Sequence, residues 1–109
     1  MFDIDISIIT VGYSSQKTLP ALLNSIKKQE GCKFEFIYVE NNAANPSCEI
    51  VKEHIPSAII IEPKANLGFS KGCNLGYTVA KGRYLLFRHA QREPIFKITT
   101  KKPFYSNFT

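Results

Sequence analysis

The sequence predicts an α/β fold built on a four-stranded, mainly parallel sheet with helices on both of its faces. Short runs rich in isoleucine and valine alternate strictly with segments whose apolar residues recur at helical spacing. Such alternation favours parallel strands joined by right-handed crossovers. The 109 residues suffice for one small domain, and 44% of them are hydrophobic, which supports a packed core.

Four apolar runs are the expected strands of this sheet. They span residues 4–11, 34–40, 58–61 and 83–87, and turn residues bound each of them. Runs this short and this rich in β-branched residues are typical of buried parallel strands. Residues 95–100 could add one further strand, after a stretch without periodicity.

Three segments between these runs are the expected helices. The first has Thr18 as its expected cap and Pro20 tolerated in its first turn. Its apolar side chains at helical spacing are Leu19, Leu22, Leu23 and Ile26. The second is expected to open at Asn45-Pro46, and the third to reach about Ala80.

Three glycines, Gly68, Gly72 and Gly76, recur every four residues along the third helix and so share one stripe. Each interior glycine costs a helix about 1 kcal/mol relative to alanine. A sequence that keeps such glycines needs another backbone or a ligand to approach closely. Tight packing of the helix on the sheet and close approach of a ligand both explain the stripe. Asn66 and Asn74 bracket it and favour the ligand, because Asn66 lies in a loop where amides can face one.

The loops that follow the first three strands are the expected ligand site, because ligands of open parallel sheets bind beyond the carboxyl ends of the strands. These loops are Val11-Gly12-Tyr13, Glu40-Asn41-Asn42 and Asn66-Leu67-Gly68. They offer a glycine for close approach, an aromatic ring for stacking, and a carboxylate and amides for hydrogen bonds. We expect the three loops to converge at one rim and to shape a pocket for a nucleotide.

Two side chains of this rim have alternative roles. Tyr13 would cover a nucleobase, or it is a loop tyrosine that is only half-packed. Glu40 would accept hydrogen bonds from a base imide or from ribose hydroxyls, or it is a solvated charge at a strand end. The sequence leaves both pairs of alternatives open.

Four ordered motifs resemble the nucleotide-binding half of family 2 glycosyltransferases. They are Ile6-Ser7-Ile8-Ile9-Thr10-Val11-Gly12-Tyr13, Tyr38-Val39-Glu40-Asn41-Asn42, the run from Asn66-Leu67-Gly68-Phe69 through Gly72 to Asn74, and Gly82-Arg83-Tyr84-Leu85-Leu86-Phe87. The resemblance covers residues 4–87 in one register, and the N-x-G-F-x-x-G-x-N run is similar to the rhamnosyltransferase-like branch. It implies a Rossmann-like half of a GT-A fold. It also implies transfer of a sugar from a nucleotide diphosphate donor to a glycan or lipid-linked acceptor, typically in polysaccharide assembly.

The resemblance also implies which residues would bind the nucleotide sugar. The loop from Thr10 to Tyr13 would contact the base, and Glu40, where the family usually has aspartate, would hold the base or the ribose. Asn66 and Gly68 would line the donor pocket. The full set of expected donor-binding residues is Thr10, Val11, Gly12, Tyr13, Glu40, Asn42, Asn66, Gly68, Gly72 and Asn74.

The chain departs from the family where catalysis would begin. There the family has an acidic motif after the fourth strand, and its carboxylate holds a divalent cation (Mg or Mn) at the diphosphate. Here Phe87 is followed by Arg88-His89-Ala90-Gln91, and no acid occurs before Glu93. Asp3 and Asp5 form a literal D-x-D, but they stand at the amino end of the first strand, on the opposite edge of the sheet. We therefore expect no metal ligands and no catalytic residue.

Residue 87 also divides the expected organisation of the chain. Residues 1–87 form the nucleotide-sugar-binding half-domain, whose nine basic and eight acidic side chains nearly balance. Residues 88–109 form a divergent basic tail with five basic side chains and one acidic. Arg88 or Arg92 would have to replace the metal electrostatically. Loss of activity is the better expectation for what resembles a truncated relative without its acceptor half.

A non-catalytic nucleotide-binding or protein-interaction module is the alternative function. In a fragment, the fourth strand would leave an unpaired edge through which the chain could self-associate. The nearly neutral body, which lacks interleaved basic and aromatic residues, argues against a nucleic-acid partner.

Location and redox state follow from simpler features. No apolar run is long enough to span a membrane, and Met1-Phe2-Asp3 is no signal peptide, so we expect a cytoplasmic protein, membrane-associated only in full-length relatives. Cys32, Cys48 and Cys73 form no C-x-x-C pair and are expected to be reduced thiols.

Overall fold

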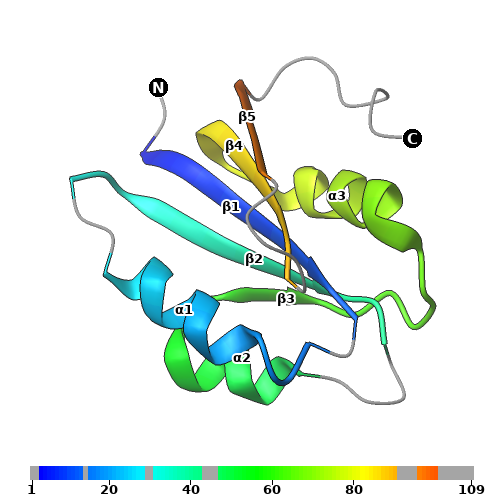
Figure 1. Cartoon of the computed structure of the whole chain (residues 1–109). Helices are drawn as coiled ribbons and strands as arrows, with labels where there is room; N and C mark the ends of the chain where they lie inside the picture. The colour runs from blue at the N-terminus through cyan, green and yellow to red at the C-terminus, as the bar shows by residue number, and fades with distance from the viewer. Residues whose placement is uncertain (1–2, 14, 29–30, 43–46, 91–95, 101–109) are drawn as a thin grey trace.

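One five-stranded sheet organises the computed structural model, which describes residues 3–13, 15–28, 31–42, 47–90 and 96–100 (Figure 1). The strands are β1 (Ile4–Gly12), β2 (Phe34–Glu40), β3 (Ile59–Ile61), β4 (Gly82–His89) and β5 (Phe96–Thr100). Their order across the sheet is β3-β2-β1-β4-β5. The first four strands are parallel to one another, and β5 runs antiparallel to β4. The four expected parallel strands are confirmed, and β5 is the further strand expected near residues 95–100.

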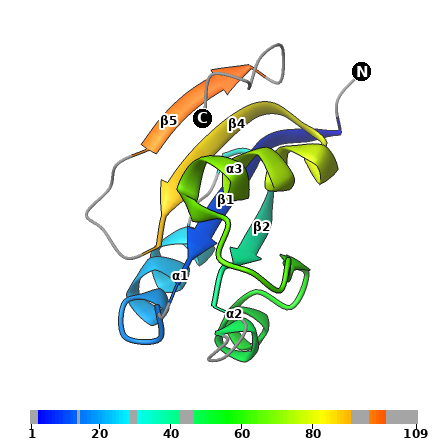
Figure 2. The same ribbon diagram turned by 90° about the vertical axis from the view of Figure 1, so that its right-hand side faces the viewer.

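Three helices cover the two faces of the sheet. α1 (Leu19–Lys27) and α2 (Cys48–His54) lie against one face, and α3 (Gly68–Val79) lies against the other (Figures 1 and 2). The α/β fold with helices on both faces is thereby confirmed. The chain moves outward from β1 to β2 and β3, and then crosses to the other side of β1 with β4. The carboxyl end of β1 is therefore the switch point, where open parallel sheets form their ligand crevice.

One apolar cluster fills the space between the sheet and the helices α1 and α2. α1 buries the four side chains that its spacing predicted, which are Leu19, Leu22, Leu23 and Ile26. They pack in one cluster with Ile8 of β1, Phe36 of β2 and Val51 of α2. Because successive residues of a strand face opposite sides, the same strands supply a second set of side chains to α3.

α3 packs on that second set with close approach of its backbone. The cluster beneath it includes Ile9, Val11, Val39 and Phe87. A Cβ at Gly72 would lie 2.9 Å from Val11 Cγ1, and a Cβ at Gly76 would lie 2.5 Å from Ile9 Cγ2. Both positions leave no room for a methyl group. Tight packing of helix on sheet therefore explains these two glycines of the stripe.

Thr18 precedes α1, but its side chain forms no helix cap. Its hydroxyl donates instead to the carbonyl oxygens of Ala90, at 2.9 Å, and Ser15, at 3.3 Å. Thr18 therefore occupies the expected N-cap position without a capping hydrogen bond from its side chain, because the tertiary fold brings Ala90 from beyond β4 to the start of α1. The expected opening of α2 at Asn45-Pro46 lies outside the described residues, and the helix itself begins at Cys48.

The end of the chain differs from expectation at one edge of the sheet. β4 continues to His89, beyond the division expected at residue 87, and β5 pairs with it from Arg88↔Phe96 to Tyr84↔Thr100. The edge of β4 that we expected to be unpaired is therefore covered, and the outer strands of the described sheet are β3 and β5. The sheet therefore extends beyond residue 87. The division of the chain into two parts at that residue stays a prediction, and the part of the expected basic tail after residue 100 lies outside the described residues.

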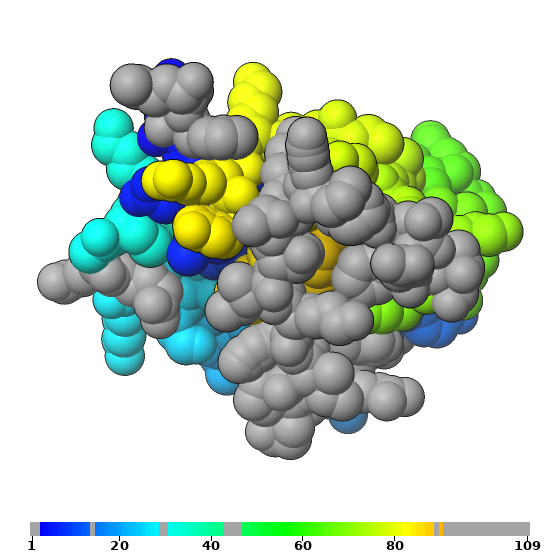
Figure 3. Space-filling view, turned by 90° about the horizontal axis from the view of Figure 1, so that it is seen from above, coloured from blue at the N-terminus to red at the C-terminus, as the bar shows by residue number. Residues whose placement is uncertain are grey.

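The amino ends of the parallel strands gather at the end of the molecule seen in Figure 3, where β1 is blue, β2 cyan and β4 yellow. Here the backbone N–H of Lys33 donates to the Asp5 carboxylate at 2.9 Å. Ile4 lies opposite Gly82 at this end of the β1–β4 ladder, whereas Gly12 ends β1 at the far side. The literal D-x-D therefore lies on the opposite edge from the expected ligand site, as predicted.

Candidate functional site

A cavity of about 220 Å³ opens at the carboxyl edge of the sheet. The loop after β1, the loop after β2 and the start of α3 together line it. Its lining residues are Val11, Gly12, Tyr13, Asn41, Asn66, Gly68 and Phe69. The three loops that the sequence singled out therefore meet at one rim, as the parallel topology predicts.

Contacts with the side chains of Tyr38 and Ser15 shape the loop after β1. A Cβ at Gly12 would collide with the hydroxyl of the buried Tyr38 and would lie 2.9 Å from Ser15 Oγ. The backbone N–H of Tyr13 donates to the same Ser15 Oγ at 3.2 Å. Tyr13 itself is 44% exposed and borders the cavity. Gly12 thus lets the chain pass close over Tyr38, and this passage places the Tyr13 ring at the rim.

Glu40 ends β2, and its carboxylate turns into the protein, where it is 1% exposed. One carboxylate oxygen accepts a hydrogen bond from the backbone N–H of Ser47 at 2.6 Å, and the other accepts from that of Asn42 at 3.0 Å. The alternative of a solvated charge at a strand end is therefore wrong. Through these two hydrogen bonds, Glu40 connects the loop after β2 to the start of α2. It does not line the cavity, and its contact with a base or ribose stays a prediction.

The electrostatics around Glu40 follow from its burial. Burial raises the pKa of the Glu40 carboxyl, and the hydrogen bonds from Ser47 and Asn42 oppose this rise. Burial also raises the pKa of the Tyr38 hydroxyl, and the neighbouring Glu40 charge adds to that effect. Tyr38 therefore keeps its proton at neutral pH.

Asn41 lies at the rim, in the loop after β2, and the sequence assigned it no role of its own. Its backbone N–H donates to the carbonyl of Gly12 at 2.8 Å. Its side-chain NH₂ donates to the carbonyl of Gly68 at 3.1 Å, and its Oδ1 accepts from the N–H of Leu67 at 3.2 Å. Asn41 is only 4% exposed. One residue therefore joins all three loops of the cavity.

The alternation of side chains along β2 was the signal that could have found Asn41. Tyr38 belongs to the cluster under α1 and α2, whereas Val39 belongs to the cluster under α3. Two residues beyond Val39, the same alternation directs Asn41 toward α3. A polar side chain on an otherwise apolar face, where the next helix begins, is the feature to look for.

Asn66 and Gly68 shape the backbone that leads into α3. Asn66 Oδ1 accepts a hydrogen bond from the N–H of Gly68 at 3.0 Å. Gly68 has a φ of 81°, in the left-handed region that glycine adopts most readily. Apart from its chain neighbours and the backbone of α3 itself, no atom of the described residues lies within 4 Å of the place that a Cβ of Gly68 would take. The need for glycine here is therefore conformational, unlike the need for space at Gly72.

The cavity brings together five of the expected donor-binding residues, which are Val11, Gly12, Tyr13, Asn66 and Gly68. The other five do not line it. Thr10 and Glu40 are buried, Gly72 packs on Val11, and Asn42 donates its backbone N–H to Glu40. Asn74 Oδ1 is buried on α3 without a hydrogen-bond partner among the described residues. A role for these five in donor binding stays a prediction.

The residues that the structure describes do not fit a divalent cation. Within them, no three His, Cys, Asp or Glu side chains lie close enough together to hold a metal ion. Glu40, the acid at the end of β2, already accepts two backbone N–H groups. The residue that follows Phe87 in β4 is Arg88, a cation in place of a carboxylate. The described part of the chain therefore has no ligand set for a metal at a diphosphate.

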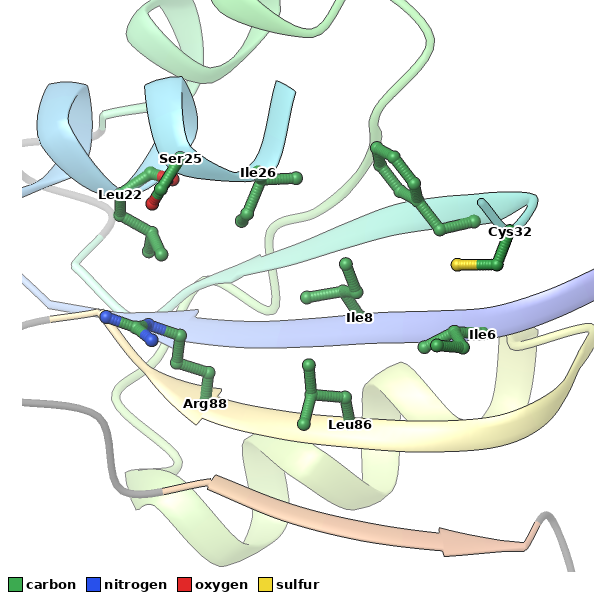
Figure 4. A pocket seen from close by; sticks show the side chains of 9 residues that line it. Ile6, Ile8, Leu22, Ser25, Ile26, Cys32, Leu86 and Arg88 are labelled. Atoms are coloured by element: carbon green, nitrogen blue, oxygen red, sulfur yellow. The ribbon is translucent and has the colours of Figure 1, made fainter. Parts of the chain in front are cut away.

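Arg88 does not line the cavity. It lies in an apolar groove of about 210 Å³ on the α1 side of the sheet, with Leu22 and Ile26 of α1 on one wall and Ile8 of β1 on the floor (Figure 4). Its Nε is buried without a hydrogen-bond partner among the described residues. Arg88 is therefore not placed to replace a metal in the cavity, and Arg92 lies outside the described residues.

A mainly parallel sheet with a cavity at its switch point is the arrangement in which open α/β proteins bind their ligands. The sequence matches the family described as Glycosyl transferase family 2 over residues 7–90. Because this match covers most of the chain, the chain belongs to glycosyl transferase family 2.

Individual relatives agree with this family. An uncharacterized glycosyltransferase of Haemophilus influenzae is 29% identical over 82 residues, which are 75% of this chain and 28% of that protein. The crystal structure of S. aureus TarS 1-349 has a TM-score of 0.74 at 26% identity and covers 81% of this chain and 28% of its own. The complex of TarS 1-349 with UDP-GlcNAc has a TM-score of 0.73 at 26% identity, covering 81% of this chain and 27% of its own.

A more distant likeness concerns the fold alone. Mannosyltransferase PcManGT from Pyrobaculum calidifontis, in complex with GDP-Man and Mn²⁺, has a TM-score of 0.71 at 18% identity, over 84% of this chain and 31% of its own. The GT-A-like arrangement expected from the sequence is thus confirmed. The chain spans about 28% of the length of the first relatives that it matches.

Proposed function

We propose that this chain is the donor-binding portion of a family 2 glycosyltransferase and that its cavity binds the nucleoside diphosphate part of a nucleotide sugar. The observation that carries the proposal is the convergence of Tyr13, Asn66 and Gly68 on one cavity at the switch point of the sheet. TarS, a relative with the same fold, has been crystallised with UDP and with UDP-GlcNAc, which supports the same ligand class here.

The lining suggests how each part of the nucleotide would bind. The exposed ring of Tyr13 offers a face on which a base can stack. The first turn of α3, which begins at Gly68, presents backbone N–H groups that suit phosphate oxygens. Glu40 would act on the base or ribose through the loop that it holds. Thr10, Asn42, Gly72 and Asn74 complete the expected donor-binding set.

We further propose that sugar transfer by this chain is weak or absent. The described residues hold no cluster of acids for the divalent cation that the family uses, and the chain spans about 28% of the length of the first relatives that it matches. A rhamnose-type sugar, a glycan or lipid-linked acceptor, polysaccharide assembly and a cytoplasmic location belong to this proposal on the strength of the resemblance. Among the described residues, no helix has the length and apolar character needed to cross a bilayer.

A non-catalytic nucleotide-binding module is the second candidate, and the same lack of an acidic cluster in the described residues favours it. The two candidates share the cavity and differ in chemistry. An assay of sugar transfer from UDP-, GDP- and dTDP-sugars, with and without Mn²⁺, separates them: turnover supports the enzyme, and binding without turnover supports the module.

Calorimetry with UDP, GDP and dTDP, each with and without its sugar, tests the shared claim. Substituting Tyr13→Ala should weaken binding by about tenfold or more, because stacking of a base on an aromatic ring is worth roughly 1–3 kcal/mol. Tyr84→Ala is the matched control, since Tyr84 is 41% exposed and lies on β4 outside the cavity. Failure of every nucleotide to bind the wild-type chain would remove the donor-site proposal.

A further inference from the structure

We propose that Asn41 is a positioning residue that holds the three loops of the cavity in one arrangement before a nucleotide arrives. This inference rests on the proposed function, because it concerns the same cavity, and it adds a role that the family motifs did not assign. Asn41 borders the cavity, yet its hydrogen-bonding atoms point to the protein.

The geometry of Asn41 links three segments that are distant in sequence. Its backbone N–H reaches back to the Gly12 carbonyl at 2.8 Å, at the end of β1. Its side chain reaches forward over 26 and 27 residues, to the N–H of Leu67 and the carbonyl of Gly68. Tyr13 follows Gly12 and Asn66 precedes Leu67, so the two proposed ligand-facing side chains are each one residue away from a group that Asn41 holds.

The chemistry of these bonds requires an amide at this position. One partner is a carbonyl, which needs a donor, and the other is an N–H, which needs an acceptor. Aspartate can accept from Leu67 but places a carboxylate beside the Gly68 carbonyl. Alanine leaves both groups without a partner, and at 4% exposure of Asn41 water is poorly placed to replace it.

Affinity should depend on this arrangement because a loop that is ordered before binding loses less conformational entropy when the ligand arrives. Both polar atoms of the Asn41 amide are engaged in the nucleotide-free chain, so Asn41 acts through Tyr13, Asn66 and Gly68. The inference therefore predicts two separable effects of its substitution, one on the loops and one on binding.

Amide hydrogen exchange in the nucleotide-free chain tests the effect on the loops. The informative groups are the backbone N–H of Tyr13, which donates to Ser15 Oγ, and the backbone N–H of Gly68, which donates to Asn66 Oδ1. Neither N–H group donates to Asn41, so a change in its exchange reports on the loops rather than on a lost hydrogen bond to Asn41. In Asn41→Ala and Asn41→Asp, both should exchange at least about tenfold faster than in the wild type, since opening of the loops becomes easier.

Asn24 provides the matched control for these variants. Asn24 is exposed on α1, so Asn24→Ala and Asn24→Asp make the same chemical changes away from the cavity. If Asn41→Ala does not fold, Asn41→Ser, which keeps a polar atom, is measured in its place. Faster exchange at Leu67 alone, with Tyr13 and Gly68 unchanged, would show a local hydrogen bond and overturn the inference.

Binding of UDP, measured by calorimetry, tests the second effect. Both Asn41→Ala and Asn41→Asp should bind about tenfold more weakly, and the Asn24 variants should match the wild type. Asn41→Asp alone could weaken binding because its new charge repels the diphosphate. Weaker binding of UDP by Asn41→Ala, which adds no charge, separates the positioning role from this repulsion. Equal affinity of wild type and Asn41→Ala would overturn the positioning role. Failure of the wild type to bind any nucleotide would count against the proposed function, and hydrogen exchange would still decide whether Asn41 holds the loops.

Discussion

Glu40 shows, at the scale of one residue, how a carboxylate close to the cavity can stabilise the fold instead of facing solvent. Its charge is buried, and two backbone N–H groups, from Asn42 and Ser47, offset part of the cost of removing it from water. The same burial raises the pKa of the Glu40 carboxyl, which ties the stability of the folded chain to pH.

The pH dependence of stability follows from the sign of this shift. Burial raises the pKa of Glu40 in the folded chain above its ordinary value of 4.5, so the folded state binds the proton more tightly. The stabilisation from the protonated carboxyl is fully present below about pH 4.5 and is lost as pH rises through the raised pKa. We predict that the unfolding free energy of the wild type falls over this window relative to Glu40→Gln, which does not titrate. Urea unfolding at a series of pH values measures it, with the exposed Glu53→Gln as control. Parallel curves for wild type and Glu40→Gln would contradict the prediction.

Gly68 carries a second prediction at this scale. Its φ of 81° costs a residue with a Cβ roughly 1–2 kcal/mol, although space around the position is open. Gly68→Ala should therefore lower the unfolding free energy by about that amount, and Gly68→Asn by less, because asparagine tolerates this region better. Chemical denaturation of the two variants decides it. A loss for Gly68→Asn that equals or exceeds the loss for Gly68→Ala would contradict the conformational explanation.

How much of the site could be predicted from the sequence depends on whether the topology of the sheet alone places a residue, or whether contacts with distant residues do so. Tyr13, Asn66 and Gly68 were predictable, because they belong to loops that a parallel sheet places at one edge. The burial of Glu40 was not, because its partners are backbone N–H groups whose positions depend on the loop after β2. The role of Asn41 was missed because its side-chain partners, Leu67 and Gly68, lie where α3 begins, and only the packing of that helix on the sheet brings them within reach.

At the scale of elements, the contact between β1 and α3 fixes how close the helix lies to the sheet. Gly72 faces Val11 so closely that an added methyl group would meet both methyl groups of the valine, at 2.9 and 3.0 Å. The glycine stripe thus sets the height of α3 above β1, and with it the position of the Gly68 end of the helix at the cavity.

A double-mutant cycle tests this steric contact. Gly72→Ala should cost about 1–3 kcal/mol of unfolding free energy, because it overpacks the contact. Val11→Ala should also destabilise the chain, but the double variant should cost less than the sum by about 0.5 kcal/mol or more, since the smaller side chain accepts the new methyl group. Val51→Ala combined with Gly72→Ala is the control: Val51 is buried on the other face, and this pair should be additive. Additivity in both pairs would argue against the contact.

The boundaries of helices and strands were predictable where the hydrophobic periodicity and the flanking turn residues agree, as in α1 and β2. The boundaries were less predictable where contacts with residues distant in sequence determine them. Thr18 had the composition of a cap, yet its hydroxyl bonds Ala90, which arrives from beyond β4. β5 is held by its ladder to β4, a partner that residues 95–100 alone do not reveal.

At the scale of the whole molecule, β5 covers the edge of the sheet at β4 by pairing with the backbone N–H and C=O groups of that strand. A chain that ends at residue 94 would keep β4 and lose the strand that pairs with it. We predict that this shortened chain self-associates through the freed edge, because unpaired N–H and C=O groups form a template for another strand. Sedimentation velocity of both chains at matched concentrations measures it, with the 109-residue chain as the reference. A shortened chain that sediments as a monomer would show that β4 needs no cover.

The link that Asn41 makes across the molecule has a consequence for how the chain is synthesised. Its partners Leu67 and Gly68 emerge from the ribosome 26 and 27 residues after Asn41 itself. A nascent chain that still lacks the start of α3 therefore has no assembled cavity. Under the proposed function, a nucleotide would bind only chains that have completed this part of the fold, and its binding free energy would stabilise those chains alone.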